Sequence, residues 1–221
     1  MDSLSQDVAD KLHISAEGSK CEHVEQKVEC YTVEEKYIHI HDLTIHTLRT
    51  AWMLLVQSLK SNHDGYNDDC LPFPDIKPYM GYVKYSSLAY MYNIAAGVAF
   101  CDVVAYEWPA SVKKGFGKGT GRPKPEPYAL VIRAMAILPE YRGIDLSKKL
   151  FDKTVKKATD ARIYKIFVVS NPTTEECYAT LGCTPTDSSP IRLDDFKVAG
   201  YTESTCTLSL MEYTIIPADS S

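Results

Sequence analysis

Residues 128–183 read YALVIRAMAILPEYRGIDLSKKLFDKTVKKATDARIYKIFVVSNPTTEECYATLGC, and this segment has the clearest secondary-structure pattern of the chain. Its pattern predicts a buried strand over 128–138, a tight turn, an amphipathic helix over 145–159 and a second strand over 163–170. A strand, a helix and a strand in this order form a βαβ unit, whose two strands lie parallel in one sheet. The chain is therefore predicted to be an α/β protein.

Hydrophobic periodicity predicts more elements on both sides of this unit. They are strands over 37–41, 94–106 and 206–216, and helices over 43–59 and 173–181. We expect Asp42 to be the N-cap of the first of these helices, because a short polar side chain there precedes the first apolar position of the helical pattern. Helices would thus flank a sheet with mixed edges.

Composition limits the classes of function. The 221 residues carry a net charge of −5 and a pI near 5.7, so the chain lacks the surplus of Lys and Arg that a general nucleic-acid binder needs. Seven cysteines without a C-x-x-C pair favour reduced thiols. The N-terminal sequence lacks a signal-peptide pattern, and no 18 consecutive apolar residues occur. We expect a cytoplasmic protein that binds neither nucleic acid nor membrane, as a monomer or homodimer.

Three polar stretches lie before or between the predicted helices and strands. Residues 1–20 are predicted to be a flexible leader before a single domain over 21–221. The Asn-, Asp- and Pro-rich residues 61–78 should form a loop able to carry a substrate site. The basic, Gly-rich residues 108–127 match neither phosphate-binding glycine motif, so we interpret them as a connection, with a basic contact for phosphate or a partner as the alternative.

The turn after the first parallel strand bears most directly on function. Its sequence PEYRGIDLSKKL places Arg142, Gly143 and Ser147 where a strand feeds the N-terminus of a helix, and exposed backbone N–H groups there can hold a pyrophosphate. Residues 142–147 resemble the motif R/Q-x-x-G-x-G/A of the GNAT superfamily of N-acetyltransferases. Residues 171–183 resemble a second, linked motif of that family, Asn followed by Tyr-x-x-Leu-Gly-Phe.

The resemblance implies the GNAT fold, in which a mixed, mostly antiparallel sheet contains a splayed parallel strand pair and is flanked by helices. It also implies acetyl-CoA as co-substrate. No metal is expected, because His39 and His41, which share one face of the strand predicted over 37–41, have no third ligand at a suggestive spacing. The residues expected to bind this cofactor are Met135, Ala136 and Ile137 along the pantetheine arm, Arg142, Gly143, Ile144, Asp145, Leu146 and Ser147 around the pyrophosphate, and Asn171 and Tyr178.

By the same resemblance, Tyr178 would be the general acid that protonates the leaving thiolate. The alternative is an aromatic side chain that packs its helix on the sheet. Asp145 stands where the family has Gly. A carboxylate about 5 Å from a phosphate charge would cost roughly 3 kcal/mol at an effective dielectric constant of 20. Asp145 as an N-cap that bonds the same amides would give a weakly binding or non-binding protein.

The residues after the second motif are similar to the tail of the invertebrate arylalkylamine N-acetyltransferases. In that family an acidic loop follows the first helix, and Asp69 would here be the general base, or else a turn-forming loop residue. Thr174 would contribute to a proton relay, with an N-cap as the preferred alternative. A Tyr-rich stretch over 79–92 could line an aromatic-amine pocket, although ordinary packing is the favoured interpretation.

These observations predict an acetyl-CoA-dependent N-acetyltransferase that acts by direct transfer on a small primary amine, arylalkylamines first. A degenerate, non-catalytic GNAT-fold binding protein is one alternative. Acetylation of a polyamine, an amino sugar or a protein amine is another.

Overall fold

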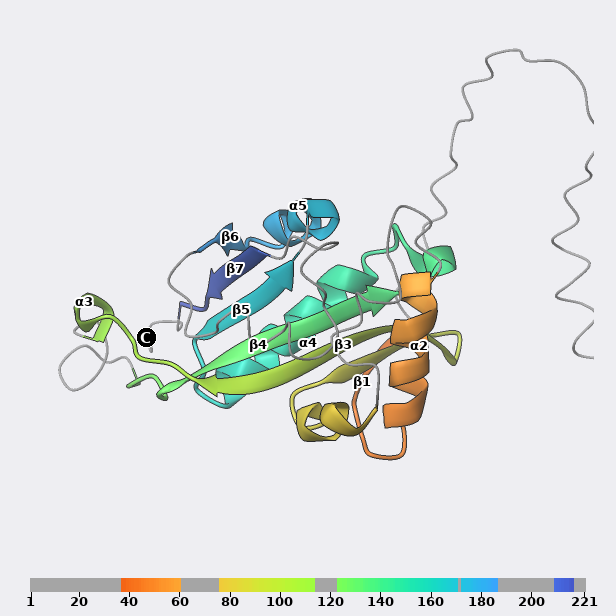
Figure 1. Ribbon diagram of the computed structural model, residues 1–221, viewed down its shortest axis with the longest axis horizontal. Coiled ribbons are helices and arrows are strands. Elements are labelled where there is room, and N and C mark those ends of the chain that lie inside the picture. The colour runs from red at the N-terminus through yellow and green to blue at the C-terminus, as the bar shows by residue number, and fades with distance from the viewer. Residues whose placement is uncertain (1–36, 61–75, 114–122, 171, 187–208, 217–221) are drawn as a thin grey trace, which may run out of the picture. The chain divides into compact units, whose positions relative to one another are not determined.

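A computed structural model describes residues 37–60, 76–113, 123–170, 172–186 and 209–216, all within the compact unit Val33–Ser221. Within these ranges the core is a seven-stranded sheet in the order β1-β2-β3-β4-β5-β7-β6 (Figure 1). Its strands are β1 (Ile38–Asp42), β2 (Ser87–Met91), β3 (Ile94–Ala105), β4 (Tyr128–Ile137), β5 (Lys165–Ser170), β6 (Thr184–Pro185) and β7 (Ser209–Thr214).

Neighbouring strands run antiparallel except for β4 and β5, which are parallel. The helical segments are α2 (Leu48–Lys60), η4 (Lys77–Tyr82), α3 (Ala110–Lys113), η5 (Pro139–Tyr141), α4 (Leu146–Asp160) and α5 (Pro172–Thr180). The predicted mostly antiparallel sheet with one parallel pair and flanking helices is therefore confirmed.

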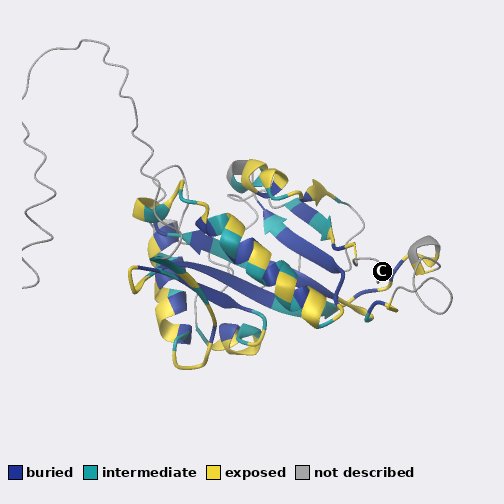
Figure 2. Cartoon of the chain, turned by 180° about the vertical axis from the view of Figure 1, so that it is seen from behind, coloured by how far each residue is buried: buried dark blue, intermediate teal, exposed yellow. Residues whose placement is uncertain are grey.

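Alternate residues of β3 mark the two faces of the sheet. The Cys101 thiol lies 3.9 Å from Thr154 Oγ1 of α4, whereas the ring of Phe100 lies 4.5 Å from that of Tyr79 in η4. We call these the α4 face and the α2 face, because α2 packs in the same buried cluster as Phe100. In Figure 2 the outward side of α4 is exposed while the strands beneath it are buried.

The first helix begins later than its hydrophobic pattern predicts. α2 starts at Leu48, and Asp42 is the last residue of β1, so the prediction of Asp42 as N-cap is wrong. Thr44 and Thr47 cap the helix instead, because each accepts the backbone N–H of the other through its hydroxyl. The Asp42 carboxylate contacts Lys153 and Lys157 of α4, and its hydrogen bond to Lys153 contributes most to lowering its pKa.

The hairpin of β2 and β3 is an element that the sequence patterns did not reveal. Its two-residue turn is Tyr92-Asn93, with φ values of +49° and +68°, as a type I′ turn requires. The tyrosines nearby have separate uses: Tyr79 is fully buried against Phe100, whereas the exposed Tyr92 stacks on Tyr37. This arrangement supports ordinary packing for both residues.

Candidate functional site

The two parallel strands separate toward their carboxyl ends. β4 and β5 pair over only three positions, Leu130–Ile132 with Ile166–Val168. Beyond Ile132, β4 continues to Ile137 and no described strand pairs with it on that side. Figure 1 shows the two strands diverging in this direction. The predicted splay is confirmed, and it opens one edge of β4 within the sheet.

Hydrogen bonds to β3 decide which backbone groups of β4 face this open edge. Leu138 N–H donates to Ala96 C=O, so Leu138 is turned toward β3. Because such groups alternate along an antiparallel strand, Ala136 also turns to β3, whereas Met135 and Ile137 present N–H and C=O to the open edge. Of the three residues predicted to bind pantetheine, Met135 and Ile137 thus have the suitable orientation.

The Ile137 carbonyl already has partners inside the protein. Ser58 Oγ of α2 donates to it at 2.9 Å and Arg142 Nε donates at 3.2 Å. Arg142 Nη2 also lies 3.5 Å from Ser58 Oγ, so the guanidinium folds back over the end of β4. With respect to the residues that the structure describes, the groups of β4 left for a ligand at this edge are the N–H of Ile137 and both backbone groups of Met135.

The turn between β4 and α4 needs two residues in the left-handed region. Gly143 has φ of +81° and Asp145 has φ of +53°. Glycine adopts this conformation without strain, and Asp tolerates it better than most side chains because its carboxylate is short. The conformation gives a physical reason for glycine at the position of Asp145 in the resembling family, and it shows that Asp145 can preserve the turn.

Asp145 precedes α4 but does not cap it. Among the residues that the structure describes, none of the helix amides bonds to the Asp145 carboxylate, which is exposed. The interpretation of Asp145 as a cap that occupies these amides is wrong, because the left-handed backbone turns its side chain away from them. The first intrahelical hydrogen bond is donated by Lys149 N–H to the Asp145 carbonyl. The earlier amides of Leu146, Ser147 and Lys148 therefore have no intrahelical acceptor.

Charges near this helix N-terminus partly balance. Lys148 Nζ lies 2.7 Å from Asp152 Oδ2, and this hydrogen bond is the main cause that raises the pKa of Lys148, with a smaller contribution from Asp145. Both side chains of the pair are well exposed, so the pair stabilises the helix only slightly. The N-terminal end of the helix dipole and the amides without an intrahelical acceptor favour an anion here, while the Asp145 charge opposes one.

Topology brings a second helix N-terminus to the same place. Because β4 and β5 are parallel, α4 and α5 both begin beyond the carboxyl ends of these strands. Ligands of open α/β sheets commonly bind outside the carboxyl ends of the parallel strands. The residues present here fit a nucleotide pyrophosphate and an extended amide-containing arm.

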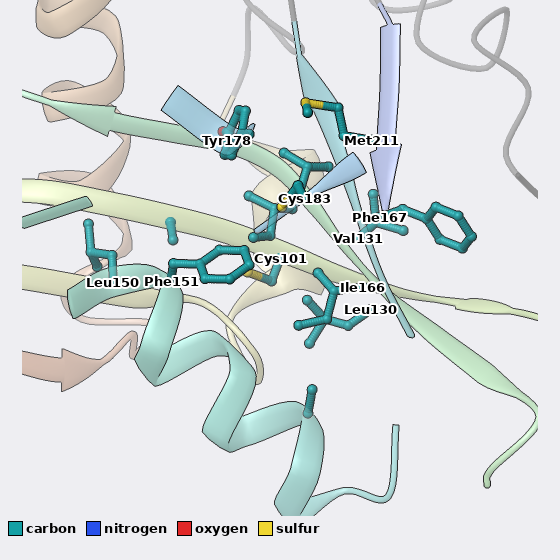
Figure 3. Packing of buried hydrophobic residues seen from close by; sticks show 14 of the residues in the cluster. Cys101, Leu130, Val131, Leu150, Phe151, Ile166, Phe167, Tyr178, Cys183 and Met211 are labelled. Carbon is teal, nitrogen blue, oxygen red and sulfur yellow. The ribbon is translucent and has the colours of Figure 1, made fainter. Parts of the chain in front are cut away.

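Tyr178 extends from α5 into the protein core. It is 4% exposed and belongs to the same buried cluster as Val131 and Cys183 (Figure 3). Its carbonyl accepts N–H groups of Leu181 and Cys183, which closes the helix. The ring therefore packs α5 on the sheet, as the alternative interpretation states, and this packing leaves the proposed role of its hydroxyl untested.

Of three other predicted site residues, the structure describes one. Thr174 lies within the first turn of α5, which begins at Pro172, so its preferred interpretation as an N-cap is wrong. Asn171 and Asp69 lie outside the described residues.

A polar cluster that sequence patterns did not reveal lies where the strands separate. The register of β3 and β4 shifts between Phe100 and Cys101, which makes Arg133 the extra residue of a β-bulge. Arg133 Nη2 bonds Asp102 Oδ2 at 2.8 Å, and the guanidinium lies 5.9 Å from the ring centroid of Tyr82. A bulge re-aims a side chain and is frequent beside active sites. Burial is the main cause that raises the pKa of Tyr82.

The other potentially reactive side chains in the described ranges form no second candidate site. Cys101, Cys177 and Cys183 are free thiols. No set of three His, Cys, Asp or Glu side chains in these parts of the chain could hold a metal ion. None of the described helices is long and apolar enough to cross a membrane.

The order of the strands, the separated parallel pair and the turn before α4 together define the fold of the GNAT N-acetyltransferases. No family model and no curated protein matches the sequence. Solved structures do match the fold.

Naa50 of Arabidopsis thaliana, in complex with the bisubstrate analogue CoA-Ac-MVNAL, has 16% identity and a TM-score of 0.51 over 81% of this chain and 99% of that one. Polyamine N-acetyltransferase of Drosophila melanogaster has 11% identity and a TM-score of 0.56 over 80% and 100%. A putative arylalkylamine N-acetyltransferase 7 of the yellow fever mosquito has 11% identity and a TM-score of 0.54 over 81% and 88%. At such identities the likeness establishes the fold.

Proposed function

We propose that the protein is an acetyl-CoA-dependent N-acetyltransferase that transfers acetyl directly to a small primary amine. The observation that carries this proposal is the open edge of β4 beside the uncapped N-terminus of α4. The open edge of β4 suits an extended amide chain, and the N-terminus of α4 suits a diphosphate. Both lie at the carboxyl end of the parallel pair β4 and β5. Acetyl-CoA contains both chemical groups and supplies an acetyl group activated as a thioester.

The chain's own residues would bind and orient the cofactor. Met135 N–H and C=O and Ile137 N–H would pair with the amides of the arm as an added strand does. The N–H groups of Leu146, Ser147 and Lys148 would donate hydrogen bonds to the pyrophosphate, and the first two of these residues belong to the predicted motif over 142–147. Arg142, which bonds the Ile137 carbonyl, would fix the end of β4 between these two contacts.

Acetyl transfer to an ammonium substrate needs two proton movements, and we assign them to the predicted residues. Asp69 would take a proton from the amine, and Tyr178 would give its phenolic proton to the leaving thiolate. The position of Tyr178 on α5, the helix that begins beyond the carboxyl end of β5, supports the second role. Thr174, in the first turn of α5, would assist as a relay.

The amine that we propose is an arylalkylamine. Support comes from the similarity of the C-terminal sequence to arylalkylamine N-acetyltransferases and from the net charge of −5, which favours a cationic substrate. Polyamines, amino sugars and protein amines are the competing acceptors. A panel of these amines with acetyl-CoA and a thiol-detecting dye tests the proposal. Release of CoA with tyramine as the best substrate supports it, and no release with any amine rejects it.

A second candidate is a non-catalytic protein of this fold that serves as a binding module. The exposed Asp145 carboxylate beside the α4 amides favours it, since that charge would weaken a diphosphate contact. Calorimetric titration with acetyl-CoA separates the two candidates. Heat that saturates at micromolar cofactor supports the enzyme, and no heat at millimolar cofactor supports the binding module.

A further inference from the structure

Resting on the proposed function, we propose that Asp102 and Tyr82 form the recognition site for the acceptor amine, in which the Asp102 carboxylate receives the ammonium group and the Tyr82 ring receives the organic part. The argument starts from the direction of approach. α4 covers one face of the sheet near the opening, where its Leu146 and Leu150 pack against Gly97 of β3. We therefore place the approach of the amine on the α2 face, where α2 contacts the end of β4 through Ser58 and the Asp102 side chain is partly exposed.

Asp102 lies on that face. Cys101 points to α4 and Phe100 points to η4, so Asp102, the next residue of β3, shares the face of Phe100. Its carboxylate contacts Arg133, the first residue of β4 beyond the last parallel pair at Ile132. The cluster thus lies on the approach side and directly beside the point where the strands separate.

The exposure of these side chains suits recognition of a small ligand. The Asp102 side chain is 27% exposed, whereas that of Arg133 is 13% exposed. The guanidinium therefore lies mainly behind the carboxylate and holds it, while the carboxylate keeps a solvent-facing side. Asp102 Oδ1 accepts Val103 N–H at 2.7 Å, so both oxygens are fixed in orientation by β3 and β4. A carboxylate oxygen can accept more than one hydrogen bond, which leaves capacity for an ammonium group.

Tyr82 supplies the apolar part of this site. It lies at the end of η4, partly exposed, and its ring meets the ring of Tyr79 edge-on at 5.9 Å. Tyr79 is fully buried and the Arg133 guanidinium lies 5.9 Å from the centroid of the Tyr82 ring, so these two contacts hold the partly exposed ring in place. An ammonium group beside a carboxylate and an aromatic body beside a ring match an arylalkylamine, with Arg133 as the positioning residue for Asp102.

The test compares tyramine with tyrosol, which has a hydroxyl in place of the amine. Both are titrated by calorimetry into the CoA-saturated wild-type protein and the Asp102→Asn variant. We expect the wild type to prefer tyramine at least tenfold and Asp102→Asn to abolish that preference, with the acetyl-CoA Kd unchanged within twofold. Asp160→Asn, a carboxylate paired with Lys156 on the exposed side of α4, is the matched control and should leave the preference intact.

An unchanged preference in Asp102→Asn overturns the proposal, and so does a wild type without any preference. A parallel loss of acetyl-CoA affinity also overturns it, because the residue would then act on the fold. If Asp102→Asn does not fold, Tyr82→Leu gives the answer: tyramine affinity should fall about fivefold while butylamine affinity stays. A protein that binds tyramine through Asp102 but releases no CoA would reject the proposed enzyme and leave this site standing.

Discussion

Gly97 of β3 lies opposite Ile137 of β4, and a Cβ atom at Gly97 would lie 3.2 Å from the Ile137 side chain. It would lie equally close to Leu146 and Leu150 of α4. This glycine therefore sets how closely the beginning of α4 approaches the end of β4. The distance between the two proposed cofactor contacts depends on that approach.

Substitution of Gly97 by alanine should move the N-terminus of α4 away from the sheet. We expect a loss of about 1–3 kcal/mol in the free energy of unfolding, as for other overpacked cores. The affinity for acetyl-CoA should fall at the same time. This fall should be larger than the decrease in the fraction of folded protein can explain. Gly81→Ala is the control, since a Cβ there meets nothing within 4 Å. Chemical denaturation and calorimetry measure both effects, and equal behaviour of the two variants would contradict the prediction.

Removal of the Asp145 charge should strengthen cofactor binding. Asp145→Asn and Asp145→Gly both tolerate the left-handed backbone and remove the carboxylate beside the α4 amides. We expect each to lower the acetyl-CoA Kd about tenfold, or more at low salt. Asp145→Ala removes the same charge but should cost about 1 kcal/mol of stability, because alanine disfavours positive φ. Identical Kd values in wild type and all three variants would show that the carboxylate lies away from the bound phosphates.

Tyr178→Phe should separate catalysis from packing. The ring stays in the buried cluster, so the acetyl-CoA Kd should change less than threefold, while kcat should fall at least tenfold if the phenol is the acid. Tyr164→Phe is a matched control, because Tyr164 is also 4% exposed. The pH profile of kcat gives an independent measure, since loss of the acid removes the decline at high pH. Equal kcat values in both variants would leave Tyr178 with a structural role.

The buried thiols should resist alkylation. Burial is the main cause that raises the pKa of Cys101 and of Cys183 to about 12, so the reactive thiolate is scarce at neutral pH. Below that value the thiolate fraction rises tenfold per pH unit, and so would any labelling. At pH 8 we expect iodoacetamide to modify the exposed Cys177 in the native protein and to spare Cys101 and Cys183, as peptide mass spectrometry can measure. Equal modification of Cys177 and Cys183 would contradict the burial.

The βαβ unit was predictable because its signals are local. Apolar runs, a Gly-containing turn and a 3.6-residue period lie within one continuous stretch, and the ends of β4, α4, β5 and α5 agree with the predicted ranges within one or two residues. β2 was missed because its turn, Tyr92-Asn93, lacks the glycine that usually marks a two-residue hairpin.

Long-range features of the site were beyond local patterns. The contact of Arg133 with Asp102 spans 31 residues and depends on a bulge that appears only in the register of two strands. The conformation of Asp145 was likewise hidden, because an Asp before a helix ordinarily indicates an N-cap. In both cases the backbone direction at one residue decides where its side chain points.

The three residue pairs between β4 and β5 have a mechanical consequence. They are the only strand-to-strand hydrogen-bonded connection between the β1–β4 half and the β5–β7 half of the described sheet. A molecule bonded to the free edge of β4 and to the helix that follows would strengthen the connection between these two halves of the sheet. Its presence should slow amide exchange around Val131 and Val168 and raise the melting temperature, so occupancy could be followed through the rigidity of the scaffold itself.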